Sequence, residues 1–210
     1  MTSLARTERA ALCDLLDELG PDAPTLCEGW TTSELAAHLV LRERRPDAVA
    51  GLLVRSLAAR ADRIQRGYTG LPWPRLVDLV RSGPPRWSPA ALPPVDAAVN
   101  TIEFYVHHED VRRAGGDWSA RTLTAANEEE LWRRLRMMAR PLLRKAPTGV
   151  VLRRDDGVLW RARPGSSYVT LSGPASELVL YAYGRGDQAT VEVLGDPADT
   201  DRFRKASLGF

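Results

Sequence analysis

The sequence predicts an α+β fold, with a helical part over residues 1–147 and a small α+β part over residues 148–210. Up to residue 147, apolar residues recur with the spacing of amphipathic helices, and beyond it short apolar runs alternate with turn signals. With 210 residues and 44% hydrophobic content, the chain is long enough for a sizeable core. The C-terminal part has about 60 residues, too few for a comfortable core of its own, so we expect it to pack against the helices.

The first helices are marked by their ends. The first helix is expected to end at Gly20-Pro21. Before that point, Leu12, Leu15, Leu16 and Leu19 form an apolar stripe with helical spacing. Thr31-Thr32-Ser33-Glu34 has the pattern of a capping box and is expected to open a second helix, which contains His38. Pro46 should end or restart that helix, and residues 47–65 continue as a third helical segment.

A proline-rich stretch over residues 71–94 cannot form one long helix, so we expect a long crossover with a short helix at residues 75–80. It leads into a helix that contains Glu103 and stops at Gly115-Gly116. Residues 123–143 supply the last long helix of the first part.

After Pro147 the pattern is that of strands. Residues 150–152 and 158–160 flank Asp155-Asp156-Gly157, a hairpin signal. A third strand is expected at residues 168–171, a helix at 174–183 with a proline in its first turn, a fourth strand at 190–194 and a closing helix at 196–206.

Two histidines and a glutamate form the candidate functional site. Glu103 and His107 are spaced i, i+4, so they share one face of their helix, and His38 lies on the apolar face of a different helix. An imidazole on a core-facing surface is costly without a partner. Two imidazoles and a carboxylate, with positions left open, form a ligand set typical of catalytic zinc, iron, nickel or manganese sites.

Neighbouring residues complete this candidate site. Asp110 lies three residues after His107 on the same stripe, where it is expected to accept the second ring N–H of that ligand. His108 points about 100° away from His107, so we expect a rim or surface residue rather than a fourth ligand. The alternative remains that the histidines are ordinary hydrogen-bonded core residues, because an E-x-x-x-H spacing also arises by chance.

Composition argues against several other classes of protein. The net charge is only +2, and arginine clusters such as 42–45 and 133–136 are interleaved with acidic or apolar residues, so neither nucleic acid nor a membrane is an expected partner. Cys13 and Cys27 do not form a disulfide framework, and a packed thiol is the expected role of each, with a position near the candidate site as the alternative for Cys27. Because the N-terminus has no apolar signal region, a cytoplasmic location is expected.

Two runs of sequence resemble a known family. The run Leu26-Cys27-Glu28-Gly29-Trp30-Thr31-Thr32-Ser33-Glu34-Leu35-Ala36-Ala37-His38-Leu39 and the E-x-x-x-H-x-x-D run that ends at Asp110 resemble the mycothiol-dependent maleylpyruvate isomerase superfamily, part of the DinB-like group of metal-binding four-helix bundles. The segment from Ser172-Gly173-Pro174 to Gly184-Arg185 resembles the sterol-carrier-like domain that follows the bundle in these isomerases. The resemblance implies a bundle over residues 1–147 and such a domain over 148–210.

The resemblance also implies a chemistry. It implies that His38, Glu103 and His107 bind zinc and that the reaction uses a low-molecular-weight thiol, mycothiol in bacteria that make it, on a small electrophilic substrate. Residues 83–89 and the doubled His107-His108 are more similar to a sister subfamily of actinobacterial type, which lacks an assigned substrate, than to the isomerase itself. The resemblance therefore implies the fold and the metal, whereas the reaction, a thiol transfer or an isomerisation, is expected and not fixed by it.

An anionic substrate needs a cation, and Arg185 and Arg86 are the candidate catalytic arginines. An arginine near a helix C-terminus can instead serve only the helix dipole. A metal-binding or small-ligand-binding module without turnover remains the alternative function, because no separate general base or nucleophile stands out.

Overall fold

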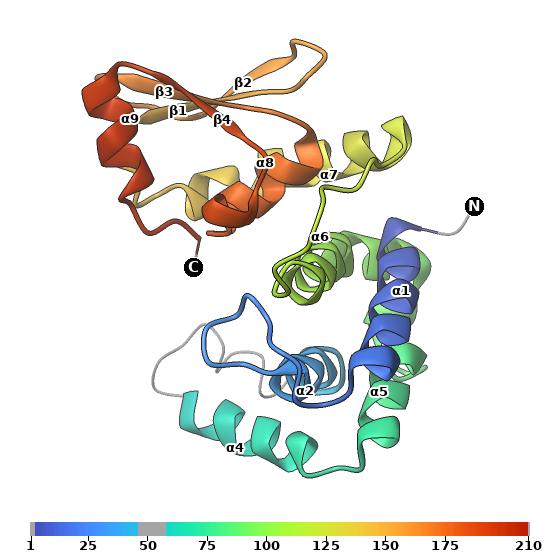
Figure 1. Cartoon of the computed structure of the whole chain (residues 1–210). Helices are drawn as coiled ribbons and strands as arrows, with labels where there is room; N and C mark the ends of the chain where they lie inside the picture. The colour runs from blue at the N-terminus through green and yellow to red at the C-terminus, as the bar shows by residue number, and fades with distance from the viewer. Residues whose placement is uncertain (1–2, 46–57, 210) are drawn as a thin grey trace. The chain divides into compact units, whose positions relative to one another are not determined.

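The computed structural model describes residues 3–45 and 58–209. Internal contacts divide the chain into two compact units, Met1–Trp118 and Ser119–Phe210. The predicted α+β class is confirmed, since helices make up the described part of the first unit and a four-stranded sheet lies in the second (Figure 1). Within the described residues, no helix is both long enough and apolar enough to cross a lipid bilayer.

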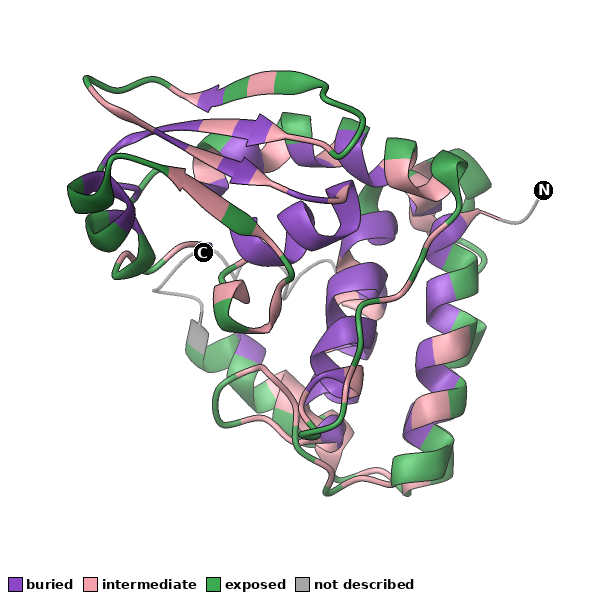
Figure 2. Ribbon diagram, turned by 45° about the horizontal axis from the view of Figure 1, so that its top comes forward, coloured by how far each residue is buried: buried purple, intermediate pink, exposed green. Residues whose placement is uncertain are grey.

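Helices α1 (Leu4–Leu19), α2 (Thr32–Arg44), α4 (Ala58–Thr69), α5 (Trp73–Ser82) and α6 (Pro93–Arg112) form the first unit. A large cluster of buried side chains from α1, α2, α5 and α6 forms most of its core; among them are Leu12, Leu16, Leu35, Leu39, Val77 and Phe104. A smaller cluster joins α2 to α4 through Leu41 and Ala61. Burial of such leucines contributes about 1.5–3 kcal/mol each, which holds α6 between its neighbours. Most of α6 from Asn100 to Val111 is buried (Figure 2).

Local sequence explains the helix ends of this unit. The capping box is confirmed at Thr31 and Glu34, where each side chain accepts a backbone N–H at the start of α2. The short helix predicted at residues 75–80 is longer, since α5 starts at Trp73. Pro74 fits in its first turn because a backbone N–H at that position would have no acceptor within the helix. Pro46 and residues 47–57 of the third predicted segment lie outside the described residues, while α4 covers the remainder.

The second unit combines α7 (Ala125–Leu142), β1 (Gly149–Arg153), β2 (Leu159–Arg163), β3 (Tyr168–Ser172), α8 (Ala175–Ala182), β4 (Glu192–Gly195) and α9 (Pro197–Arg204). The sheet order is β2-β1-β3-β4: β1 pairs antiparallel with β2 and parallel with β3, and β3 pairs antiparallel with β4. Alternate residues of the central strands are buried, as a half-covered sheet requires: Val150, Leu152, Val169 and Leu171.

The strand and helix predictions for the C-terminal part are confirmed, including the hairpin, whose Gly157 takes the left-handed conformation at φ 84°. The sequence pattern changes at residue 147, whereas the internal contacts change at residue 118, because α7 packs on α8 and β2. The small sheet thus gains its core from a helix that precedes it. The domain boundary at residue 147 itself stays a prediction.

Candidate metal centre

Three potential ligand atoms converge within the first unit. His38 Nε2 lies 3.2 Å from Glu103 Oε1, and His107 Nε2 lies 3.3 Å from the same oxygen. All three ligand atoms lie within 4.8 Å of one another. The structure therefore brings together the residues that the sequence selected, one from α2 and two from α6.

Helical geometry accounts for this convergence. The i, i+4 spacing stacks Glu103 and His107 one turn apart on α6, and α2 presents His38 opposite them, with its ring centroid 5.4 Å from that of His107. The three side chains are 11–20% exposed, so water or a small ligand can still reach them. Trp30, from the loop between α1 and α2, packs on His38 with 5.0 Å between ring centroids and forms one wall.

The donor set fits a divalent metal. Bonds of about 2.0–2.1 Å at tetrahedral angles place neighbouring ligand atoms about 3.3 Å apart, as the two histidine–Glu103 separations are. His38 Nδ1 is buried and has no hydrogen-bond partner among the described residues, so this ring is held through the nitrogen that points at Glu103. Contacts within the protein thus position the three candidate ligand atoms.

The electrostatics of the three groups differ. Burial would raise the pKa of Glu103, but hydrogen bonds to His107 and His38 and the charge of Arg42 hold it well below its usual range. Burial would lower the pKa of His107, but hydrogen bonds to Asp110, Cys27 and Glu103 raise it well above its usual range. Burial lowers the pKa of His38. These contacts therefore favour the carboxylate form of Glu103 and the protonated form of His107.

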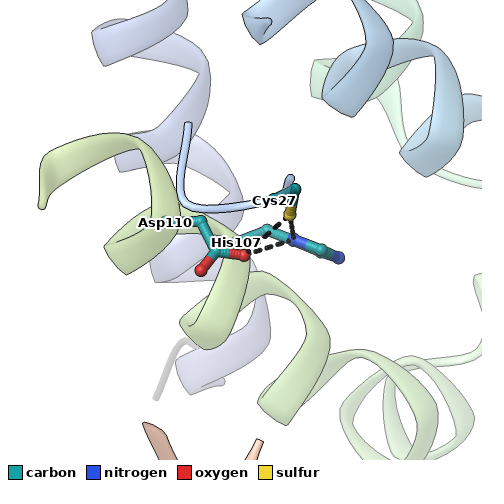
Figure 3. Close-up of side chains that lie close together, drawn as sticks. All are labelled: Cys27, His107 and Asp110. Atoms are coloured by element: carbon teal, nitrogen blue, oxygen red, sulfur yellow. Dashed lines mark hydrogen bonds and ion pairs between the residues drawn. The ribbon is translucent and has the colours of Figure 1, made fainter. Parts of the chain in front are cut away.

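The other side of His107 is fixed by Asp110 and Cys27. His107 Nδ1 donates to Asp110 Oδ2 over 3.0 Å, and the Cys27 thiol donates to the same oxygen over 3.2 Å (Figure 3). The Asp110 side chain is fully buried. The Cys27 loop is attached to α6 because Leu26 N donates to Asp110 O over 3.0 Å. The predicted contact between Asp110 and His107 is present.

Cys27, His107 and Asp110 form a second group with ligand-like atoms within 4.8 Å of one another. The two groups use different nitrogens of His107, Nδ1 here and Nε2 toward Glu103. On the Nδ1 side, Asp110 accepts hydrogen bonds from the ring N–H of His107 and from the Cys27 thiol. On the Nε2 side, His107 faces Glu103, whose side chain is 20% exposed. His38, Glu103 and His107 are therefore the candidate ligands, and the Cys27 group contacts His107 from its other side.

The sequence interpretation missed two contacts of this centre. It preferred a packed thiol for Cys27, which does pack against the core, and it did not predict the hydrogen bond to Asp110. That contact depends on how the loop attaches to α6, for which the sequence carries no local signal. It did not select Arg42, whose Nε lies 3.3 Å from Glu103 Oε1. Arg42 follows His38 by four residues on α2, and that i, i+4 spacing was a usable signal.

The prediction for His108 was wrong. His108 is 5% exposed rather than a rim or surface residue, and its Nδ1 lies 2.7 Å from Glu8 Oε2 of α1. Its direction, away from His107, follows from helix geometry as expected. The error concerns burial, because α6 packs on α1 as well as facing α2 and so has no exposed side at this level.

Each of the two candidate arginines has contacts of its own. Arg86 is exposed and lines a cavity of about 380 Å³ with Arg6, Arg9 and Asp96, a cavity whose lining includes none of the three ligands. Arg185, in the second unit, donates from Nη1 to Tyr183 O over 2.6 Å just after α8. That bond satisfies a carbonyl at a helix C-terminus. A role of either arginine at the metal centre stays a prediction.

Comparisons with known proteins support the fold. No protein-family model and no curated protein matches the sequence. Among solved structures, the mycothiol-dependent maleylpyruvate isomerase is similar, with a TM-score of 0.59, 21% identity, and coverage of 92% of this chain and 93% of that chain. A histidine-to-alanine mutant of that enzyme matches equally well. The resemblance seen in the sequence is thus confirmed at the level of the fold.

Proposed function

We propose that the chain binds a divalent metal, zinc in the first place, through His38, Glu103 and His107, and uses a low-molecular-weight thiol such as mycothiol to transfer a thiol to, or isomerise, a small electrophilic substrate. The observation that carries the proposal is the convergence of three ligand atoms on two helices. Support comes from the shared fold with a mycothiol-dependent isomerase.

When bound, the metal would supply a Lewis acid that activates a thiol or polarises a substrate carbonyl. The protein's residues prepare that chemistry. Asp110 accepts the Nδ1 proton of His107 and so leaves Nε2 as the ligand nitrogen. Glu103 carries the negative charge, and Trp30 covers the His38 ring and excludes water from one side. Arg86 and Arg185 remain proposed anion-binding residues.

The direct test measures thiol consumption. Zinc-loaded protein is incubated with a thiol and an electrophile, either a maleyl compound or an epoxide, and the free thiol is assayed over time. We expect metal-dependent consumption that His38→Ala lacks. Stoichiometric metal with no thiol consumption for any electrophile would instead favour the non-catalytic metal- or ligand-binding module.

Metal affinity should depend on pH. Because ligation by His107 Nε2 displaces a proton whose pKa is raised well above the usual histidine value, affinity for Zn²⁺ falls as the pH drops below that pKa, by about tenfold per pH unit. Competition with a chromophoric chelator between about pH 6 and 8 measures it. Asp110→Asn removes the hydrogen bond that contributes most to the raised pKa of His107, so the loss of Zn²⁺ affinity should begin at a lower pH. An affinity independent of pH would contradict the assignment.

Asp110→Asn should also weaken Zn²⁺ binding at neutral pH by about 10- to 100-fold while the fold stays intact, because the carboxylate fixes the ring of His107. Cys27→Ser is the matched control. Its hydroxyl still donates to Asp110, so affinity should change by no more than a few-fold. A large loss in Cys27→Ser, with little change in His38→Ala, would show that the metal lies between Cys27, His107 and Asp110 instead.

A further inference from the structure

Arg42 is a cation in direct contact with the ligand triad. Its Nε lies 3.3 Å from Glu103 Oε1, while Nη1 donates to Asn100 Oδ1 over 2.7 Å and Nη2 donates to Val99 O over 2.9 Å. The last two acceptors are neutral. Within the described residues, Glu103 is therefore the carboxylate that pairs with this guanidinium.

Asn100 fixes the position of the Arg42 guanidinium. Asn100 is buried and donates from its amide to Glu43 Oε1 over 2.9 Å and to Asp96 Oδ1 over 2.8 Å, which fixes the oxygen that accepts from Arg42. The Arg42 side chain is nevertheless 25% exposed. A positioned, partly accessible guanidinium beside the ligand atoms can contact a small molecule at the centre with little loss of conformational freedom.

Charge balance indicates what that molecule carries. Once the Glu103 carboxylate binds a divalent cation, its negative charge is shared, and Arg42 has no other acidic partner within the described chain. A further anion beside the metal would compensate the guanidinium, and a carboxylate matches its planar donors. A neutral ligand would leave that charge uncompensated.

We infer that Arg42 is a specificity-determining residue that binds a carboxylate of the ligand at the metal centre, so that the site selects small carboxylate-bearing molecules over neutral ones. The inference rests on the proposed function. It assigns recognition of this carboxylate to α2, one helical turn after His38, in addition to any contact with the proposed anion-binding residues Arg86 and Arg185.

The test uses the full chain loaded with Co²⁺, whose visible spectrum reports the ligands of the metal. Two thiols are titrated, 3-mercaptopropionate and its methyl ester, and the near-ultraviolet thiolate-to-cobalt band gives each affinity. In Arg42→Met we expect stoichiometric cobalt, a loss of at least about tenfold in affinity for the carboxylate, and a change within about twofold for the ester. Arg42→Lys keeps the positive charge but not the planar pair of N–H donors, so its affinity for the carboxylate should fall less than that of Arg42→Met.

Arg81→Met is the control for a general loss of positive charge, since Arg81 pairs with the exposed Asp14 and Asp17, and it should leave both affinities unchanged. Equal losses for both thiols, no loss in Arg42→Met, or loss of cobalt from both Arg42 variants would overturn the inference. So would a selective loss of the carboxylate in Arg86→Met or Arg185→Met while Arg42→Met retains it. If the unaltered protein binds no cobalt, the proposed function itself fails, and this inference with it.

Discussion

His107→Ala should lower affinity for Zn²⁺ by on the order of a hundred- to a thousandfold, since zinc sites of four ligands bind with about 10–16 kcal/mol and one ligand accounts for about a quarter of it. His38→Ala should lose a similar amount. The physical reason is that Glu103 and the remaining histidine leave an incomplete shell. Metal analysis after dialysis, followed by chelator competition, measures the effect.

His108→Ala is the matched control for this prediction. His108 is the next residue of α6 and is as buried as His107, but it pairs with Glu8. Its removal should destabilise the fold, because it deletes the buried hydrogen bond between His108 and Glu8, yet the metal should remain stoichiometric. Full metal content in His38→Ala or His107→Ala would refute the ligand assignment. An equal loss of metal in folded His108→Ala would also count against it.

The residues on α6 were predictable because helix periodicity is a local property. The phase that aligns Glu103 with His107 also aligns Asp110, and the structure shows these three in mutual contact through His107. The partnership with His38 was different. Nothing local specifies that α2 faces α6 at this level, so the sequence identified His38 through its apolar neighbours and through the family resemblance.

What the sequence did not predict depends on tertiary packing. His108 was misjudged because a single apolar stripe predicts one buried face, whereas α6 is buried on the His108 side too. Cys27 reaches Asp110 only because its loop is bonded to α6 through Leu26. Likewise, an arginine within the first helix, Arg9, resembles a solvated charge in sequence and is in fact 6% exposed.

Arg9→Met should destabilise the first unit by at least about 3 kcal/mol, because it removes the buried cation shared by Glu43 and Asp96 and leaves Asp96 only the largely exposed Arg6 at 3.8 Å. Arg9 donates to both oxygens of Glu43 over 2.6 Å and to Asp96 Oδ1 over 2.9 Å, and all three side chains are at most 7% exposed. The Arg9 guanidinium also lies 4.2 Å from the ring centroid of Phe104, so the network is embedded in the core.

The penalty of Arg9→Met should grow with pH. Burial raises the pKa of Glu43, and the hydrogen bonds from Arg9 only partly offset it, so the substitution raises that pKa further. A carboxyl group whose folded pKa lies above its unfolded value of 4.5 binds its proton more tightly when folded. Stability is then lost as the pH rises, so the penalty should be larger near pH 7 than near about pH 5.

Urea unfolding of the metal-free protein at both pH values measures this penalty, with Arg81→Met as the matched control. Arg81 also bonds two carboxylates, at 2.7 and 2.6 Å, but those groups are more than half exposed, so its loss should cost no more than about 1 kcal/mol. Equal effects of the two substitutions would mean that burial does not set the strength of the Arg9 network. Since Asn100 joins Glu43 to Arg42, a destabilised network should also reduce the carboxylate preference of the cobalt-loaded protein, even where Arg9→Met remains folded.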